Sequence, residues 1–410
     1  MHFYNVKSVE ETLQIIGREV GGITESERRP LAKARGYVLS NDLLSPENVP
    51  GFTRSTVDGY AVRARDTYGS SETSPQFLQV VGEVHMGEEV NRPLAAGEAM
   101  YIPTGGMLPP DSDSVIMIEY CEDLSGMLNT YRQVAPGENV IRLGEDVRQG
   151  DTLLAKGTRL RPQELGILAS VGLTEVDVFR KIRVGYLSSG DEIVPYQKER
   201  LNVGEVRDMN EITVSSFIEE WGGEVLLGGI VKDDFESFRQ KAEELFAEVD
   251  FLILSGGSSV GAKDYTTEVI QSLGDPGVLV HGVSVKPGKP TIFSMANGKP
   301  VLGLPGHPAS AVVIFLLFGR AIMSKRQGES EKILPRRIQA RISQNIPSSP
   351  GRADYIRVRL TRENDEWWAH PVLGKSGLLS TLVQSDGLVE IESPKEGVQR
   401  GEWVPVLPLR

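Results

Sequence analysis

The chain has 410 residues, enough for roughly two to four domains, and its hydrophobic fraction of 40% and charged fraction of 24% are ordinary for a globular protein. Its 44 basic and 56 acidic residues give a net charge of −12, which argues against a broad nucleic-acid surface. The single cysteine, Cys121, excludes an intramolecular disulfide, and the five histidines show no HxxxH or CxxC spacing, so no zinc site is predicted. The N-terminus lacks a signal-peptide pattern, and the longest apolar run, residues 311–318, is too short to span a bilayer. We therefore expect a cytoplasmic protein with neither a nucleic acid nor a membrane as partner.

The N-terminal segment predicts helices. A capping box, serine at position 8 followed three residues later by glutamate, begins a helix with one apolar face, and a second helical piece is expected near residues 30–39. A third helix is predicted over residues 162–171, which begin with proline and are followed by glycine. We expect these helices to pack together as a small linking domain made of residues 1–46 and 145–178.

Between these helices, the sequence predicts a β-rich domain over residues 47–144. Short runs typical of strands are separated by Gly and Pro turns. They cover residues 77–81, 100–102, 114–118 and 129–134. The domain is therefore expected as an insertion within the linking domain.

From residue 183 onward, strand-like and helix-like segments alternate, among them a helix with one apolar face over residues 235–249 and a strand near residues 278–285. This pattern indicates a three-layer α/β domain with a mainly parallel sheet, over residues 179–326, in which ligands bind beyond the carboxyl ends of the strands. Alternating strands return after residue 327 and predict a β-barrel-like C-terminal domain extending to residue 410. The predicted fold class is a multidomain α/β plus β protein.

The stretch over residues 251–267 is the most informative for function. A buried strand over residues 251–254 stops at a Gly/Ser turn containing Gly256, Gly257 and Ser258, and a helix is expected to follow from residue 265. Such a turn presents backbone N–H groups to an anion, and Asp264 lies beside it. The alternative is a tight β–α turn without a ligand.

Other predicted strands also end in polar turns. One leads into Asp191 and Glu192, another into Asp233 and Asp234, and a Lys-Pro-Gly-Lys-Pro turn begins at residue 286. An oxygen-rich set of acids without paired His or Cys suits Mg²⁺, which commonly bridges carboxylates and phosphate. The alternatives are that these acids cap helices and that the lysines lie in a solvated turn. His307 is expected to begin a helix rather than to bind a ligand.

Short motifs follow one another along the chain: residues 55–61 (STVDGYA), 102–106 (IPTGG), 137–139 (GEN) with 144–146 (GED), 189–192 (SGDE), 255–261 (SGGSSVG) with 264–266 (DYT), 286–290 (KPGKP) and 303–306 (GLPG). Each motif is weak alone. Together, and in this order, they resemble the MoeA family of molybdopterin molybdenumtransferases, which includes the E domain of gephyrin, over nearly the whole chain.

The resemblance implies a cytosolic homodimer with four domains per chain. It implies conversion of adenylylated molybdopterin and molybdate into molybdenum cofactor and AMP in the presence of Mg²⁺, with the adenylyltransferase of the preceding step as a candidate partner. Matching the motif positions implies these catalytic residues: Asp58, Thr104, Asp146, Glu192 and Asp264. It implies these substrate-binding residues: Gly256, Gly257, Ser258, Lys286, Lys289, Arg352 and Ser376. The implied metal-binding residues are Glu192, Asp233 and Asp264.

The chain departs from the family pattern at three places. Gly282 stands where many members carry a lysine, His307 replaces a frequent asparagine, and residues 207–210 are a looser form of an Asp-Ser-Asn-like stretch. The alternatives to the insertase are a scaffold of the gephyrin type, a tungstate-specific insertase, and a pyridine-nucleotide or pterin-binding module sharing only the α/β domain. The motifs around Asp58 and Thr104 argue against such a module.

Overall fold

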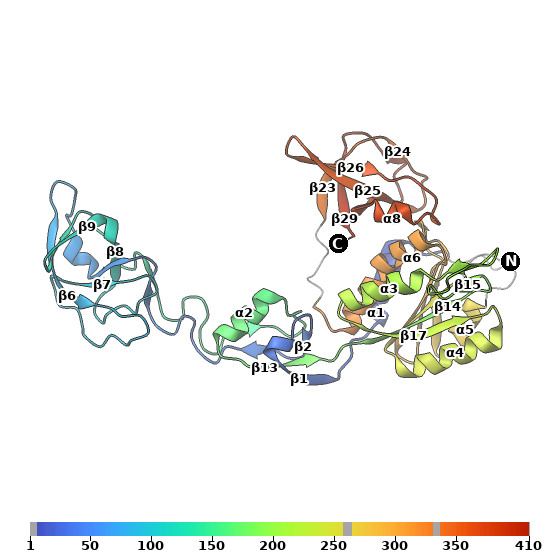
Figure 1. The fold of residues 1–410 in the computed structure, drawn as a ribbon, viewed down its shortest axis with the longest axis horizontal. Coiled ribbons are helices and arrows are strands. Elements are labelled where there is room, and N and C mark those ends of the chain that lie inside the picture. The colour runs from blue at the N-terminus through green and yellow to red at the C-terminus, as the bar shows by residue number, and fades with distance from the viewer. Residues whose placement is uncertain (1–5, 257–264, 331–336, 410) are drawn as a thin grey trace.

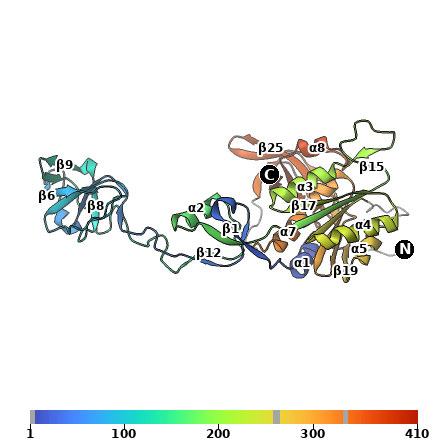
Figure 2. The same cartoon turned by 60° about the horizontal axis from the view of Figure 1, so that its bottom comes forward.

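The computed structural model describes residues 6–256, 265–330 and 337–409. The molecule is elongated, with a β-rich body at one end and an α/β domain carrying a C-terminal barrel at the other (Figure 1). A narrow linking region separates them, and the turned view shows the same separation (Figure 2). The multidomain α/β plus β fold class is therefore confirmed. The limits of the four domains stay a prediction.

The α/β domain is built on a six-stranded sheet in the order β17-β14-β18-β22-β21-β19. The first three pairings are parallel and the last two antiparallel, so the sheet is mainly parallel, as predicted. Its strands are β14 (Arg183–Ser189), β17 (Glu224–Val231), β18 (Phe251–Ser255), β19 (Pro276–His281), β21 (Ile292–Ala296) and β22 (Lys299–Leu304). A small parallel pair, β15 (Ile193–Val194) and β16 (Val206–Arg207), follows β14.

Helices cover both faces of this sheet and make three layers. Alternate residues of β18 point to opposite faces: Phe251 and Ile253 belong to one core, and Leu252 and Leu254 to the other. The first core also receives α3 (Asn210–Glu220), α6 (Pro308–Ile314) and α7 (Arg320–Arg326), whereas α4 (Phe235–Glu248) and α5 (Thr266–Ser272) pack on the second.

The stretch Pro308–Arg326 is long and apolar enough to cross a membrane by length and composition alone. It consists of α6, a π-helical turn (Phe315–Gly319) and α7, and 61% of its most apolar window is buried inside the protein. Phe315 and Phe318 are fully buried in the sheet core. The stretch is therefore the core helix of the α/β domain.

The N-terminal helix α1 (Val9–Glu19) is capped as predicted. Ser8 accepts a hydrogen bond from the Glu11 N–H at 3.0 Å, and the Glu11 carboxylate accepts one from the Ser8 N–H at 2.7 Å. However, its apolar side chains Val9 and Ile16 lie in the α/β core, beside α7. The expectation that α1 packs with the helix over residues 162–171 is therefore wrong, because the α/β domain buries its apolar stripe instead.

The linking region contains a small antiparallel sheet rather than being a helical unit. Strands β1 (Ser26–Pro30), β13 (Glu175–Phe179) and β2 (Val38–Leu39) pair in the order β1-β13-β2, beside α2 (Pro162–Ser170). The predicted helix over residues 30–39 is wrong: only the turn Leu31–Lys33 is helical, and the chain turns at Gly36 (φ 81°) to pair with β13. A second pair, β3 (Leu43–Leu44) with β12 (Thr152–Leu154), continues toward the β-rich body.

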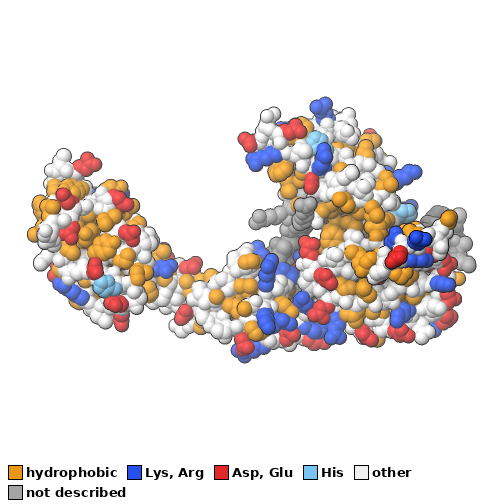
Figure 3. All heavy atoms as spheres, in the orientation of Figure 1, with side chains coloured by type: hydrophobic (Ala, Val, Ile, Leu, Met, Phe, Trp, Pro, Cys, Tyr) orange, Lys and Arg blue, Asp and Glu red, His pale blue; other side chains and the backbone are white. Residues whose placement is uncertain are grey.

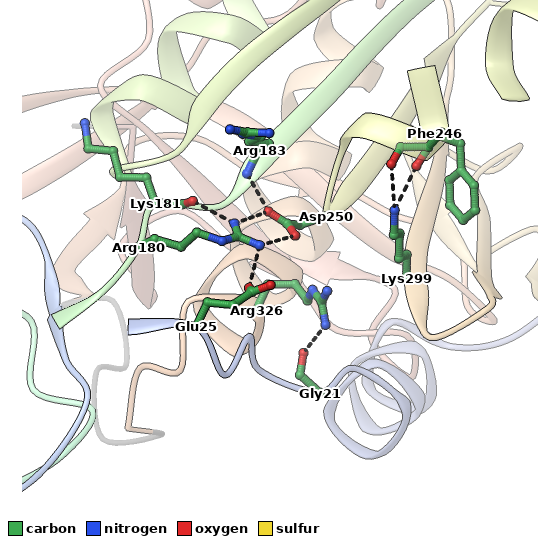
Figure 4. A network of polar contacts seen from close by, with 10 residues as sticks. Gly21, Glu25, Arg180, Lys181, Arg183, Phe246, Asp250, Lys299 and Arg326 are labelled. Atoms are coloured by element: carbon green, nitrogen blue, oxygen red, sulfur yellow. Dashed lines mark hydrogen bonds and ion pairs between the residues drawn. The ribbon is translucent and has the colours of Figure 1, made fainter. Parts of the chain in front are cut away.

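Charged side chains tie this linking region to the α/β domain (Figure 4). Arg180 donates to both carboxylate oxygens of Asp250, at 2.7 and 2.9 Å, and to Glu25 at 2.6 Å. Arg326, at the end of α7, donates to the Gly21 carbonyl at 2.9 Å. Side chains from both regions thus hold the linking region against the α/β domain.

The β-rich body contains a six-stranded sheet in the order β8-β5-β7-β6-β10-β9. Its strands are β5 (Gly59–Val62), β6 (Gln76–Glu83), β7 (Glu98–Ile102), β8 (Ser114–Met117), β9 (Cys121–Leu124) and β10 (Met127–Thr130). A short pair, β4 (Arg54–Ser55) with β11 (Val140–Ile141), lies where the chain enters and leaves the body. The sequence predicted β6, β7 and β8 closely and missed β5 and β9.

The C-terminal domain is a closed five-stranded barrel, β25-β26-β23-β29-β27, in which β27 returns to pair with β25. Its strands are β23 (Ile338–Ile342), β25 (Ala353–Glu363), β26 (Glu366–Pro371), β27 (Gly387–Ile391) and β29 (Trp403–Pro408), with a side pair, β24 (Ile346–Pro347) and β28 (Gly397–Val398), and the short helix α8 (Ser380–Val383). The alternating strands predicted after residue 327 are confirmed.

Candidate active site

The turn after β18 requires glycine at its first position. Gly256 has a φ of 115°, and a Cβ atom placed there would lie 2.1 Å from the backbone oxygen of Ser189, at the end of β14. The ends of these two neighbouring strands therefore meet at the start of the predicted anion-binding turn. Gly257, Ser258 and Asp264, the other residues predicted there, lie outside the described residues.

A cleft of about 700 Å³ lies between the α/β domain and the barrel. Basic side chains from both domains line it, together with a serine, and we call it the basic cleft: Lys286, Lys289, Arg352, Arg357, Lys375 and Ser376. Among the described residues that line it, none is Asp or Glu. The four predicted substrate-binding residues outside the Gly/Ser turn are thus brought to one place.

Backbone pairing fixes the two sides of the basic cleft. The short strand β20 (Val285–Lys286) leaves the α/β domain and pairs in parallel with β25, which puts Lys286 opposite Asp354. The Ala353 N–H also donates to the Ser284 carbonyl at 2.9 Å. The sequence predicted a single strand near residues 278–285, which is wrong because Gly282 (φ 88°) ends β19 and redirects the chain to the barrel.

The two arginines of the basic cleft differ in their surroundings. Arg352 donates through Nε to the buried carboxylate of Asp354 at 2.8 Å. Arg357 is only 9% exposed and donates through Nη2 to the Gly374 carbonyl at 2.7 Å, whereas its buried Nε has no partner among the described residues. Burial lowers the pKa of Arg357.

A second cleft of about 480 Å³ adjoins the first, and Pro290 lines both. We call it the glycine-turn cleft; Glu192, Gly256 and His307 are among its lining residues. It opens at the carboxyl ends of β14, β18 and β22, where a parallel α/β sheet binds its ligands. His307 directly precedes α6, as predicted.

Buried polar groups that were not predicted as site residues line the glycine-turn cleft. Asp208 accepts hydrogen bonds from the Ser188 hydroxyl and, at 3.0 Å, from the Glu211 N–H. Asn210 donates to the Gly306 carbonyl at 2.9 Å, while its Oδ1 atom and the Ser189 hydroxyl lack partners in the part of the chain that is described. The looser motif at residues 207–210 was the available signal for these side chains.

The acids predicted to bind a metal gather only in part. Glu192 is exposed at the glycine-turn cleft, and Asp233 follows β17, where its N–H donates to the Asp191 carboxylate at 3.3 Å. Within residues 6–256, 265–330 and 337–409, no three His, Cys, Asp or Glu side chains are placed to hold a metal together. Mg²⁺ commonly takes one or two protein carboxylates and keeps several waters, so the predicted Mg²⁺ site stays a prediction.

Asp58 and Thr104 form a contact in the β-rich body. The Asp58 carboxylate accepts hydrogen bonds from the Thr104 N–H at 2.7 Å and from the Thr104 hydroxyl at 3.0 Å, and these bonds lower the pKa of Asp58. Asp146 is exposed where the chain returns toward the linking region. Burial raises the pKa of the Cys121 thiol to about 12, which argues against a nucleophilic role.

The structure thus separates the predicted site residues into two groups. The β-rich body, which contains Asp58 and Thr104, lies at the opposite end of the molecule from the domains that form the basic cleft and the glycine-turn cleft (Figure 1). Within one chain these groups do not meet.

Known proteins are similar to the chain over its whole length. Family models for the MoeA N-terminal region (domain I and II), a probable molybdopterin binding domain and the MoeA C-terminal region (domain IV) match residues 7–172, 185–325 and 339–409. The molybdopterin molybdenumtransferases of Haemophilus influenzae and Bacillus subtilis are 33% and 31% identical, over 94% of this chain and 94% and 90% of their own lengths.

Two crystal structures of molybdopterin biosynthesis MoeA protein from Pyrococcus horikoshii have TM-scores of 0.75 and 0.83 and sequence identities of 38% and 31%. The matches cover 99% and 98% of this chain and 100% and 99% of those chains. The resemblance inferred from the motifs is therefore confirmed, and the chain belongs to the MoeA family of molybdopterin molybdenumtransferases.

Proposed function

We propose that this protein inserts molybdenum from molybdate into adenylylated molybdopterin and releases molybdenum cofactor and AMP. Family membership makes it an enzyme of molybdenum cofactor biosynthesis, of the molybdopterin molybdenumtransferase class. The observation that carries the specific reaction is the pair of adjoining clefts at the carboxyl ends of the sheet strands, one basic and one with a glycine turn and an acid.

The basic cleft suits a tetrahedral oxyanion. Lys286, Lys289 and Lys375 can donate charge-assisted hydrogen bonds, and no carboxylate among the described lining residues competes with the ligand. The protein has a net charge of −12, so this positively charged cleft is opposite in sign to the protein as a whole. Molybdate is the substrate we assign to it, and tungstate, which has the same charge and shape, is the alternative to be tested.

The glycine-turn cleft suits the adenylylated pterin. Gly256, with Gly257 and Ser258 beyond it, would present N–H groups to a phosphate. Glu192 and Asp233, with Asp264, would hold Mg²⁺, which would neutralise charge on the phosphoanhydride while that bond breaks. These residues would orient the phosphates beside the oxyanion, so that the two substrates would be bound close together.

The complete site, in this proposal, is shared by two chains of a homodimer. Asp58 and Thr104, with Asp146, would reach the clefts of the partner subunit, because they lie far from the clefts of their own chain (Figure 1). The β-rich body also exposes large apolar side chains, including Phe77, Met86 and Leu124. Hydrophobic side chains are visible on the surface of this body in Figure 3. A symmetric dimer would contain two equivalent sites. A cytoplasmic location and docking of the preceding adenylyltransferase complete the proposal.

The reaction is tested directly with purified protein, adenylylated molybdopterin, molybdate and Mg²⁺. AMP release and the mass of the pterin product are measured together, and parallel samples contain EDTA or tungstate. We expect AMP and a molybdenum-containing product in equal amounts, with loss of both in EDTA. An unchanged pterin in the presence of Mg²⁺ would contradict the proposal.

A further inference from the structure

We propose that Arg159 is a positioning residue for the shared active site. It fixes the linking region to the α/β domain, and so sets where the β-rich body holds Asp58 relative to the clefts of the partner subunit. The inference rests on the proposed function, because it requires a site built from two chains. No sequence motif singled out Arg159.

Three acceptors converge on the Arg159 guanidinium. Its Nε donates to the Glu329 carboxylate, and its Nη2 donates to the side-chain oxygen of Gln327. Its Nη1 donates to the Gly36 carbonyl at 2.6 Å. The Arg159 side chain is 14% exposed and the Glu329 side chain 1% exposed, so the contact is shielded from water. The planar fork of an arginine can hold several groups in one geometry, and here it joins the linking region to the segment that follows α7.

The two side-chain acceptors are themselves held by helices of the α/β domain. The Glu329 carboxylate accepts a hydrogen bond from the Ser324 hydroxyl and lies 3.7 Å from Nη2 of Arg320, and both of these residues belong to α7. Gln327 donates to the Trp221 carbonyl, at the end of α3, at 3.0 Å. The guanidinium therefore connects the linking region to two helices of the α/β domain at one point.

Glycines let the backbones approach closely at this contact. A Cβ atom at Gly157 (φ 82°) would lie 2.9 Å from the backbone oxygen of Gly328, and the Gly157 carbonyl accepts from the Ser330 N–H at 3.0 Å. A Cβ atom at Gly222 (φ 84°) would lie 2.8 Å from Nη1 of Arg159. Close packing on both sides thus leaves the arginine little freedom to change its conformation.

The ion pair in Figure 4 is a second attachment of the linking region. Arg180 donates to both carboxylate oxygens of Asp250, and the Ile23 N–H donates to the Arg326 carbonyl at 2.8 Å. Because rotation about one contact is blocked by the other, the linking region is held to the α/β domain in one orientation.

Toward the β-rich body, the linking region continues as two chain segments that bond to each other. The Val49 N–H donates to the Val147 carbonyl at 2.7 Å, between the strand pairs β3–β12 and β4–β11. The β-rich body lies at the far end of these segments (Figures 1 and 2), so a small rotation of the linking region would displace Asp58 by a larger distance. A displacement of about 1 Å in a reacting group can lower a rate about 100-fold, so a shared site needs this orientation to be fixed.

The test uses mixed dimers of full-length chains in which only one shared site can work. The first chain carries Glu192→Gln and supplies an intact β-rich body, whereas the second carries Asp58→Asn and supplies intact clefts. Arg159→Lys is then added to the first chain or to the second, and AMP release is measured. Lysine keeps the charge at this contact but lacks the fork that reaches Gly36 and Gln327 together.

The expected result depends on which chain carries the substitution. Arg159→Lys in the first chain should lower kcat at least about tenfold and leave the KM for molybdate unchanged, because molybdate binds in the clefts of the second chain. In the second chain it should have no effect, because the β-rich body of that chain serves no working site. Arg161→Met is the matched control and should change neither value, since Arg161 is exposed and pairs with Glu164 of α2 within the linking region.

Damage to the fold would lower the rate from either chain. An equal loss from both chains, or no loss from the first, would therefore overturn the inference while the proposed reaction stands. Should the Arg159→Lys chains fail to assemble, Gln327→Met replaces it in both arms with the same expected asymmetry, because it removes one acceptor and keeps the ion pair with Glu329. If the mixed dimers are inactive before any change at Arg159, the shared site and this inference fail together.

Discussion

At the scale of single residues, the basic cleft contains both exposed and buried cationic side chains. Lys286 and Lys289 are exposed side chains on a turn whose backbone is held by the barrel, and Arg357, which lines the same cleft, is buried. The exposed lysines can reorient toward a ligand at little cost, whereas the buried arginine is already fixed by its hydrogen bond to Gly374. The cleft thus offers one preorganised cation and several adjustable ones.

Replacing Lys286 by alanine should weaken molybdate binding by about tenfold, because one charge-assisted hydrogen bond is lost from an otherwise intact cleft. Calorimetry with molybdate measures the change. Lys395→Ala is the control, since Lys395 is a surface lysine of the C-terminal region that does not line the cleft. Equal affinities for the two variants would remove Lys286 from the oxyanion site.

The Asp58–Thr104 pair makes a prediction about pH. Backbone and side-chain hydrogen bonds from Thr104 hold the pKa of Asp58 below its usual value, so they stabilise the folded protein at pH values above about 4 and lose this effect as the pH falls through the lowered pKa. Thr104→Ala removes the hydroxyl and keeps the N–H, so the pKa of Asp58 should rise part of the way toward its usual value.

Carboxylate NMR titration of Asp58 measures this shift. Thr73→Ala, at an exposed threonine elsewhere in the β-rich body, should leave the pKa of Asp58 unchanged. An Asp58 titration that is the same in Thr104→Ala and wild type would show that the hydroxyl does not bind the carboxylate in solution.

Residue types and spacing predicted part of the site but could not complete it. Lys286, Lys289, Arg352 and Ser376 were identified by motif and do line one cleft. Arg357 was not, because a sequence does not show that a buried arginine nitrogen lacks a partner, and Asp208 and Asn210 were noted only through the looser motif at residues 207–210. The Lys286 variant described here tests one of these roles.

At the scale of elements, the pairing of β20 with β25 joins the two walls of the basic cleft. Only two residues of β20 take part, yet they carry the register that brings Lys286 beside Asp354. Glycine at position 282 ends β19 and lets the chain cross to the barrel. The sequence predicted a continuous strand there, because a local apolar pattern does not specify which sheet a strand joins.

The helices likewise show that a local pattern predicts an element without specifying what it packs against. The first helix and its capping box were predicted correctly, but its packing partner was not, since an apolar stripe shows that a face is buried without showing by what. The strongly periodic segments α2, α4 and β18 were predicted nearly to their observed ends. The short strands of the linking region, which form only through pairing with distant segments, were not.

The ion pairs in Figure 4 give a prediction about stability. Burial alone would raise the pKa of Asp250, but hydrogen bonds from Arg180 and from the Arg183 N–H, with the charge of Arg180, bring it below the usual value. Asp250→Asn leaves Arg180 without its bidentate partner, so it should lower the free energy of unfolding by about 2–4 kcal/mol at neutral pH, somewhat less than for a fully buried pair because Arg180 is partly exposed.

Urea unfolding at several pH values tests this effect. Because the folded-state pKa of Asp250 is lowered, the difference between wild type and Asp250→Asn should be full at neutral pH and shrink as the pH falls through that pKa. Glu243→Gln breaks an exposed pair with Arg239 and should change stability by no more than about 0.5 kcal/mol. A similar loss in both variants, independent of pH, would mean that Asp250 contributes no more than a surface pair.

At the scale of the whole molecule, the main feature is the separation between the β-rich body and the domains that form the two clefts. The chain is drawn out so that the β-rich body stands well away from the α/β domain and the barrel in both views (Figures 1 and 2). A separate body with its own cores and exposed apolar side chains is suited to contact another chain. We therefore expect a complete active site to need residues from two chains.

Subunit mixing tests this claim most directly. Asp58→Asn and Glu192→Gln proteins, each expected to be inactive alone, are co-expressed with different affinity tags, and the mixed dimers are purified through both tags and assayed for AMP release. If sites form between chains, each mixed dimer has one site carrying both substitutions and one carrying neither, so about half of the wild-type activity per dimer should return. If each site is built within one chain, every site keeps one substitution, and mixed dimers as inactive as their parents would contradict the account.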